Sequence, residues 1–128
     1  MKYMILIYSN PVSWEHPMFL NHVDSRAEER DARMSEFNAL LTEIAESGEL
    51  VDSAPLADPL NTKTVRVRDD VPATTDGPFL DSKEHLAGFF IVDCDSTERA
   101  TEIAARFPDA RYSAVEVRPI MDLSGLEM

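Results

Sequence analysis

The sequence has a single cysteine, Cys94, among its 128 residues, and therefore cannot form a disulfide within one chain. One cysteine suits a reducing cytoplasm, because structural disulfides belong mainly to oxidising compartments. Long apolar runs are also lacking. The run from Tyr3 to Tyr8 is too short to span a membrane or to form the core of a signal peptide, and no small-residue cleavage site follows it. We therefore expect a cytoplasmic protein.

Basic residues are scarce. The chain carries 12 Lys and Arg against 24 Asp and Glu, which gives a formal charge of −12. A surface this negative repels the phosphates of nucleic acids and the headgroups of anionic membranes. We therefore expect no nucleic-acid partner and no membrane partner. We also expect the chain to be highly soluble.

Several motifs that would indicate a particular chemistry are missing. The sequence contains no G-x-S-x-G nucleophile motif, no P-loop and no dinucleotide fingerprint. We therefore predict no cofactor. Internal repeats and low-complexity segments are also absent, and the length suits a single domain spanning residues 1–128.

Two segments of the sequence are apolar on both faces of an extended strand. In residues 1–8 and 86–92, apolar side chains occupy both sets of alternating positions. The alternation places Leu86 on one face with Gly88, Phe90 and Val92, and Ala87 on the other with Phe89 and Ile91. Strands buried on both faces belong at the centre of a sheet with a layer on each side.

The remaining strands are predicted to be half exposed. Residues 64–68 and 113–120 alternate apolar with charged side chains, and Pro119 closes the second of these strands. Residues 49–54 form a weaker strand, which could pair with residues 64–68 as a hairpin across the loop at 55–61.

Two helices are predicted from their end signals and their spacing. The first has a capping box at Ser25 and Glu28, a Glu29–Arg33 pair on its polar face and Gly48 as its stop. The second begins after Asp95 or Ser96 and is ended by Pro108. The buried stripes are expected at Met34, Phe37, Leu41 and Ile44 in the first, and at Ala100, Ile103, Ala104 and Phe107 in the second.

This order of elements predicts an α+β fold, a ferredoxin-like βαββαβ arrangement with an antiparallel sheet. The first and third strands are the central pair of that arrangement, and they correspond to the two segments that are apolar on both faces. Because two helices cover only one face of such a sheet, the other face needs a second cover. A second copy of the chain is the natural one, so we expect a homodimer.

The most informative segment is residues 76–90, which reads DGPFLDSKEHLAGFF. It resembles the signature of the YCII-related proteins of DGPF type: the four letters Asp76-Gly77-Pro78-Phe79 are followed at fixed spacing by Lys83-Glu84, Leu86 and Gly88. Asp81 stands where that family usually has Glu. The opening residues 1–8 and the ending residues 115–120 resemble the family as well.

The resemblance implies a dimeric α+β barrel and leaves the biochemical role open. Shorter relatives carry a His on the first helix as half of a proposed active-site pair, whereas this sequence has Met34 there. Relatives of DGPF type are often associated with extracytoplasmic-function sigma factors. The resemblance therefore leaves two functions open: a small-molecule-binding protein, with or without enzymatic activity, and a non-enzymatic accessory protein of transcription regulation.

The candidate site residues surround the turn at residues 76–79. Asp76 and His85 are the candidate acid–base residues, because a carboxylate and an imidazole are the groups most readily tuned for proton transfer near neutral pH. A rigid entry to the central strand explains the same turn without a function, and a solvated ion-pair network explains the charges. The candidate binding residues are Tyr8, Trp14, His22, Phe79, Lys83 and Glu84.

Two further groups are weighed and set aside. His16 and His22, near Glu15 and Asp24, match no standard ligand spacing, so no metal site is predicted. Cys94 stands between Asp93 and Asp95, whose charges should raise the pKa of its thiol and disfavour a role as nucleophile.

Overall fold

A computed structural model describes residues 1–9, 27–78 and 85–122 of the chain. Its elements along the chain are β1 (Lys2–Ser9), α1 (Ala27–Glu46), β2 (Leu50–Pro55), the 3-10 turn η1 (Pro59–Asn61), β3 (Lys63–Arg68), β4 (Val71–Asp76), β5 (His85–Asp93), α2 (Thr97–Ala105), α3 (Asp109–Tyr112) and β6 (Ala114–Pro119). None of the helices in these ranges is long and apolar enough to cross a membrane.

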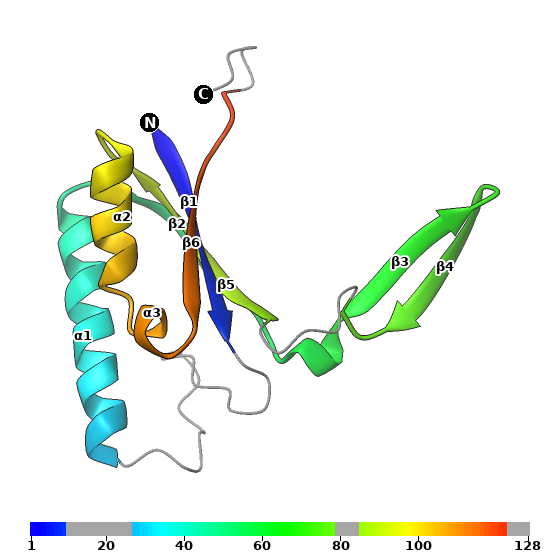
Figure 1. Cartoon of the computed structure of the whole chain (residues 1–128), viewed down its shortest axis with the longest axis horizontal. Helices are drawn as coiled ribbons and strands as arrows, with labels where there is room; N and C mark the ends of the chain where they lie inside the picture. The colour runs from blue at the N-terminus through cyan, green and yellow to red at the C-terminus, as the bar shows by residue number, and fades with distance from the viewer. Residues whose placement is uncertain (10–26, 79–84, 123–128) are drawn as a thin grey trace.

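The main sheet is antiparallel, with the strand order β2-β5-β1-β6. This order is compatible with the predicted ferredoxin-like arrangement, and it confirms that β1 and β5 are the central pair. Helices α1 and α2 lie side by side against one face of the sheet (Figure 1). The mixed α+β fold class is thus confirmed.

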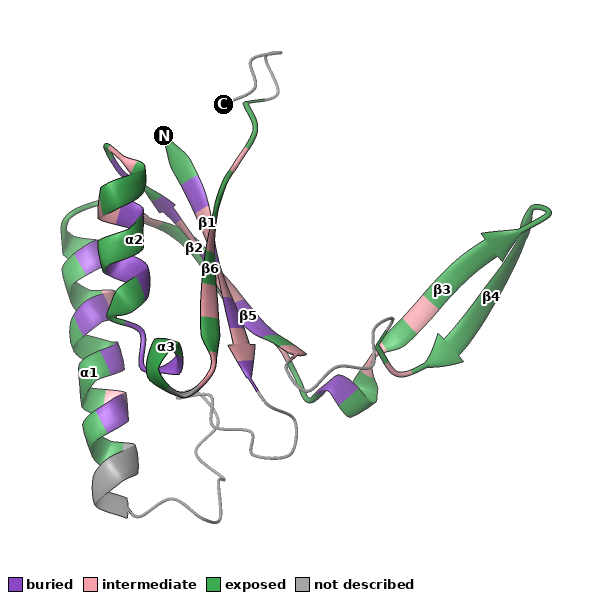
Figure 2. Cartoon of the chain, in the orientation of Figure 1, coloured by how far each residue is buried: buried purple, intermediate pink, exposed green. Residues whose placement is uncertain are grey.

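The core lies between that face and the helices (Figure 2). Three phenylalanines form its centre: the ring centroid of Phe90 is 4.7 Å from that of Phe107 and 5.9 Å from that of Phe37. All four residues predicted for the buried stripe of α2 are buried. In α1, Phe37 and Ile44 are buried as predicted, Met34 and Leu41 pack against the core from partly exposed positions, and Leu40 is a further core residue.

The opposite face of the sheet, which we call the outer face, is apolar and only half buried. Met4 pairs with Ile91 and Leu6 pairs with Phe89, and all four side chains remain partly exposed. Tyr8 continues the row with intermediate exposure. The prediction that both faces of the central strands are apolar is confirmed, and within the described ranges the helices cover only one of them (Figures 1 and 2).

The predicted facing of residue 86 is wrong because β5 contains a bulge. Ile7 pairs with Gly88, but the next residue, Tyr8, pairs with Leu86, so Ala87 is an extra residue in β5. An inserted residue reverses the alternation beyond it. Leu86 therefore shares the outer face with Tyr8 instead of sharing a face with Gly88.

The predicted hairpin between residues 49–54 and 64–68 is also wrong. Strand β2 pairs with β5 at the edge of the main sheet, whereas β3 pairs with β4, a strand that the sequence analysis did not predict. The β3–β4 hairpin turns through Asp69 and Asp70, which have φ of 51° and 63°. Two consecutive residues with positive φ are typical of a tight type I′ turn, which joins twisted strands directly.

The helix ends follow the sequence signals closely. Gly48 adopts a φ of 83° after α1, and the Ser96 hydroxyl caps α2 by accepting a hydrogen bond from the Arg99 amide at 3.1 Å. Helix α2 ends at Ala105, before Pro108, which instead precedes α3. Arg33 is buried, which corrects its predicted place on the polar face of α1. Ser25 of the predicted capping box lies outside the described residues.

Candidate functional site

The Gly77-Pro78 turn is tied to the base of the hairpin by two hydrogen bonds. The Gly77 amide donates to the Thr62 carbonyl at 2.7 Å, and the Thr64 hydroxyl donates to the Gly77 carbonyl at 2.7 Å. Gly77 adopts a φ of 93°, a conformation that side chains disfavour. The turn therefore has a structural role, since it joins the end of β4 to the start of β3.

Asp76 lies at the base of the hairpin, where its carboxylate forms an ion pair with Lys63 on the neighbouring strand. Its side chain is 84% exposed. An exposed cross-strand pair of this kind contributes little to stability. The structure thus places this candidate acid–base residue in solvent.

A cavity of about 400 Å³ opens beside the same turn. It lies where the β2–β3 connection meets the start of β5. Its lining residues are Leu56, Ala57, Asp58, Pro59, Asn61, Thr62, Pro78, His85 and Leu86. His85 is therefore brought to a cavity wall together with Pro78 of the turn, whereas Asp76 is not among these residues.

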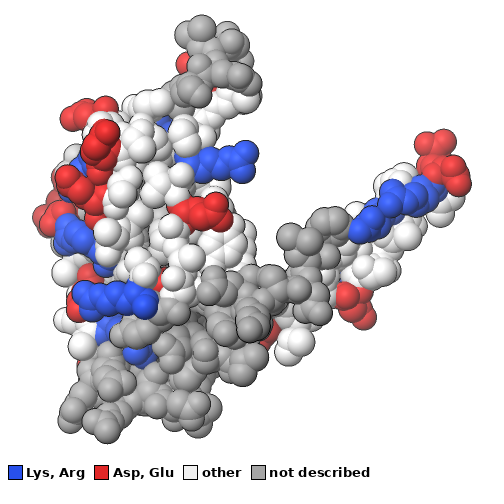
Figure 3. All heavy atoms as spheres, in the orientation of Figure 1, with Lys and Arg blue, Asp and Glu red and all other residues white. Residues whose placement is uncertain are grey.

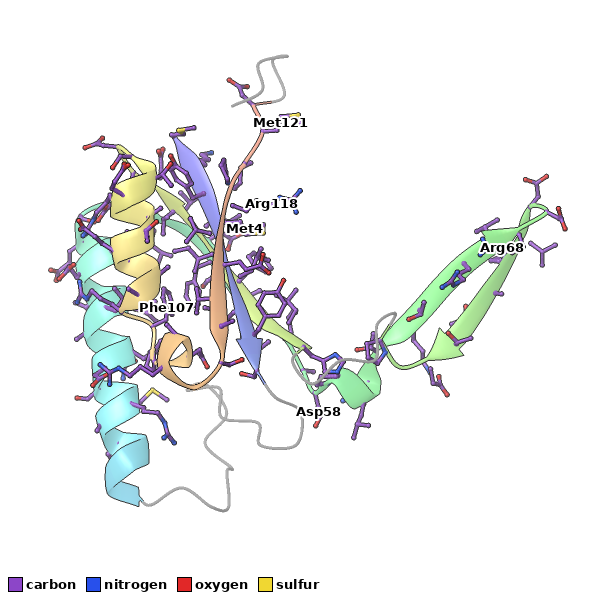
Figure 4. All side chains as sticks on the ribbon, in the orientation of Figure 1. Met4, Asp58, Arg68, Phe107, Arg118 and Met121 are labelled. Atoms are coloured by element: carbon purple, nitrogen blue, oxygen red, sulfur yellow. The ribbon has the colours of Figure 1, made fainter. Side chains whose placement is uncertain are left out.

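Asp58 supplies the one carboxylate among the described lining residues. One of its oxygens accepts a hydrogen bond from the Leu60 amide at 2.9 Å, which begins the turn η1. Figure 4 places Asp58 on this turn, between the main sheet and the hairpin. The wall thus holds a carboxylate and an imidazole amid apolar side chains, an arrangement suited to binding an organic molecule and to exchanging a proton with it.

Sequence reasoning missed Asp58, Asn61 and Thr62 as candidate residues. They belong to the connection between β2 and β3, which the sequence analysis treated as a hairpin loop. Composition offered only a weak signal, since the loop holds polar residues beside Pro59 but nothing in the sequence places it next to the DGPF turn. Loops that carry polar groups on a rigid scaffold are frequent binding elements.

Tyr8 is not among the lining residues of the cavity, but it lies on the outer face of the sheet and pairs with Leu86, which is one of them. Its pKa is raised, first by a hydrogen bond with Glu116 and then by burial, while the charge of Arg118 acts in the opposite direction. Both partners come from β6, the edge strand beside β1. Trp14, His22, Phe79, Lys83 and Glu84 lie outside the described residues, so their predicted roles remain predictions.

The described ranges contain no group of three or more His, Cys, Asp or Glu residues placed to hold a metal ion. Cys94 is buried, and its thiol pKa is raised as predicted, although burial is the main cause and the nearby charge of Glu49 adds to it.

Acidic side chains gather over the helices and at the tip of the hairpin (Figure 3).

Comparison with known proteins places the fold and the turn in a family. The model of the YCII-related domain matches residues 1–124. The chain belongs to the YCII-related family. It is also similar to an uncharacterized protein of Rhizobium meliloti (strain 1021), with 33% identity over 95 residues, which are 73% of this chain and 77% of the relative. The match confirms the resemblance to YCII-related proteins, and it is consistent with the DGPF type.

Proposed function

We propose that this YCII-related protein of DGPF type is a cytoplasmic homodimer that binds a small organic molecule in the cavity beside the Gly77-Pro78 turn. The cavity is the observation that carries the proposal. Its volume of about 400 Å³ lies in the range of roughly 300–1,000 Å³ that is usual for ligand pockets. Its lining combines apolar side chains with a few polar groups, which is also usual for such sites.

The lining defines the class of ligand. Leu56, Pro59 and Leu86 offer apolar contacts, while Asp58 and His85 offer hydrogen-bonding groups. The formal charge of −12 disfavours anions. We therefore expect a largely apolar, neutral or cationic organic molecule with at least one hydrogen-bonding group.

An enzymatic version of this function assigns the proton transfer to His85. The imidazole would act as acid or base toward the bound molecule. Asp58 is the carboxylate best placed to assist from the same cavity, in place of Asp76, which pairs with Lys63.

A non-enzymatic accessory role, in which the protein acts through a protein partner, is the second candidate. In that case the exposed valines of the β3–β4 hairpin would contact this protein partner instead of a second copy of the chain.

A thermal-shift screen of neutral and cationic organic molecules tests the binding function. A ligand present at 100 times its Kd adds about 2.7 kcal/mol to the free energy of unfolding, so hits should raise the melting temperature by several degrees. Ala57→Phe adds a ring at the cavity wall and should weaken or abolish these shifts. Ala45→Phe makes the same change on the exposed surface of α1 and should preserve them.

Two results would contradict the binding function. Hits that stabilise Ala57→Phe and Ala45→Phe equally would bind somewhere other than the cavity. A broad library with no hit for the wild-type protein would favour the accessory role.

A further inference from the structure

The β3–β4 hairpin is a two-stranded element that stands clear of the rest of the protein (Figure 1). Every residue of β4 is exposed, and in β3 only Thr64 is partly buried. An isolated two-stranded hairpin is at best marginally stable in water, because it cannot bury a sufficient apolar face. This hairpin therefore needs a surface to pack against.

One face of the hairpin is suited to packing against another protein surface. Val65 and Val67 project from the same face of β3, and the residues paired with them across the hairpin are Thr74 and Pro72. The valines are 60% and 58% exposed. An uncharged stripe of this kind on a projecting element is typical of a buried interface, and few such stripes stay in solvent.

The position of the hairpin relative to the outer face of the sheet identifies the partner. Met4 and Arg118 lie on the side of the sheet opposite the helices, and the hairpin projects on that same side (Figure 4). A protein partner that packs on the outer face would therefore also lie next to the hairpin. A second copy of the chain would cover both the outer face and the hairpin, since in a two-fold dimer each copy supplies the same surfaces.

The exposed area of the chain supports a large interface. The whole chain exposes 8554 Å². This is about 1,700 Å² more than the roughly 6,800 Å² expected of a compact monomer of its mass. One partner contributes about 800 Å² to an interface of standard size, and obligate homodimers bury more. Burial of a surface of standard size against a second copy would therefore bring the exposed area of the chain closer to that of a compact monomer.

We infer that the β3–β4 hairpin is an arm that packs its Val65 and Val67 face against a second copy of this chain. The inference rests on the proposed homodimer and specifies which element holds it together. The arm also connects the interface to the cavity. Thr62 lies just before β3 and Pro78 lies just after β4, and both residues line the cavity wall. Docking of the arm would hold that wall in place.

Sedimentation velocity over a dilution series tests the arm. We expect the dimer Kd of Val65→Asp/Val67→Asp to rise at least tenfold above that of the wild type. The matched control Ala39→Asp/Ala45→Asp adds the same charge to exposed positions of α1 and should leave the Kd within twofold. A wild-type dimer with equal Kd values for both variants overturns the arm and leaves the homodimer intact. A wild-type monomer overturns both.

A second measurement covers the case in which the aspartates unfold the hairpin itself. A photoreactive phenylalanine derivative placed at position 67 of the otherwise unchanged chain should capture a second chain on illumination. The same residue at position 39 should not. Mixing isotopically light and heavy chains distinguishes capture between copies from capture within one. Capture only within one chain overturns the arm.

Discussion

At the scale of single residues, the best-defined interaction is the pair between Glu49 and Arg99. The two oxygens of the carboxylate accept hydrogen bonds from Nε and Nη2 of the guanidinium, both at 2.9 Å. The Glu49 side chain is only 16% exposed. The pair joins the residue just before β2 to helix α2, and paired hydrogen bonds between ions are among the strongest in proteins.

The Glu49 pair makes the stability of the protein depend on pH. Hydrogen bonds from Arg99 first, and then from the Ser47 hydroxyl, lower the pKa of Glu49 from 4.5 to about 2. Because the folded chain favours the ionised carboxylate, the stabilisation is complete above the usual pKa, declines as the pH falls and is lost near pH 2. We expect Glu49→Gln to lower the free energy of unfolding by about 1–3 kcal/mol at neutral pH.

Urea unfolding followed by circular dichroism, at one fixed chain concentration, measures this effect. The loss of stability on acidification should be smaller for Glu49→Gln than for the wild type. Glu46→Gln changes an exposed carboxylate on α1 and should act within about 0.5 kcal/mol. An equal acid dependence in Glu49→Gln and the wild type would show that the pair does not contribute as described.

At the same scale, the candidate site was only partly predictable. His85 was chosen for its chemistry, and the structure places it on a cavity wall. Asp76 was chosen for its place in the DGPF motif, but its carboxylate pairs with Lys63. That pairing depends on the β3–β4 register, which requires both strands to be known. Asp58 could not be singled out, because nothing in its local sequence shows that its loop folds against the start of β5.

At the scale of elements, the strands with two apolar faces and the helices with clear end signals were predictable from the sequence. Local patterns determine these features: alternation for β1, Ser96 for the start of α2 and Gly48 for the end of α1. The hairpin was not predictable in the same way. Its turn uses two aspartates, where Asn-Gly is the usual signal, and β4 contains Pro72. The bulge at Ala87 leaves no local signal.

The turn at the hairpin tip offers a test of its conformation. Asp69→Asn/Asp70→Gly supplies residues that adopt positive φ at lower cost, so we expect the hairpin to gain about 0.5–1 kcal/mol of local stability. Hydrogen exchange at the amides of β3 and β4 should slow by about two- to fivefold. Asp69→Ala/Asp70→Ala removes the same charges without that benefit and should speed the exchange. Equal rates in the two variants would contradict the assigned turn.

At the scale of the whole molecule, the two faces of the main sheet are covered unequally. On the face against α1 and α2, the β1 side chains Tyr3, Ile5 and Ile7 are buried. On the outer face, Met4, Leu6 and Phe89 remain partly exposed. The hairpin projects on that same side (Figure 1). The sequence predicts this imbalance, because two helices cannot cover both faces of the central strands. In the proposed homodimer, a second copy of this YCII-related chain would cover the outer face, and docking of the hairpin would hold the cavity wall at its base in place.

Native mass spectrometry of the protein, incubated with hits from the thermal-shift screen, is the most direct test of a ligand-binding homodimer, because one spectrum reports both the number of chains and the bound ligand. We expect a species of about twice the 14.4 kDa chain mass that retains one ligand molecule for each chain. Leu6→Glu, which puts a charge on the outer face, should give single chains with unchanged circular dichroism. A wild-type protein that remains a single chain would overturn the homodimer, and a dimer that retains none of the hits would overturn the binding function.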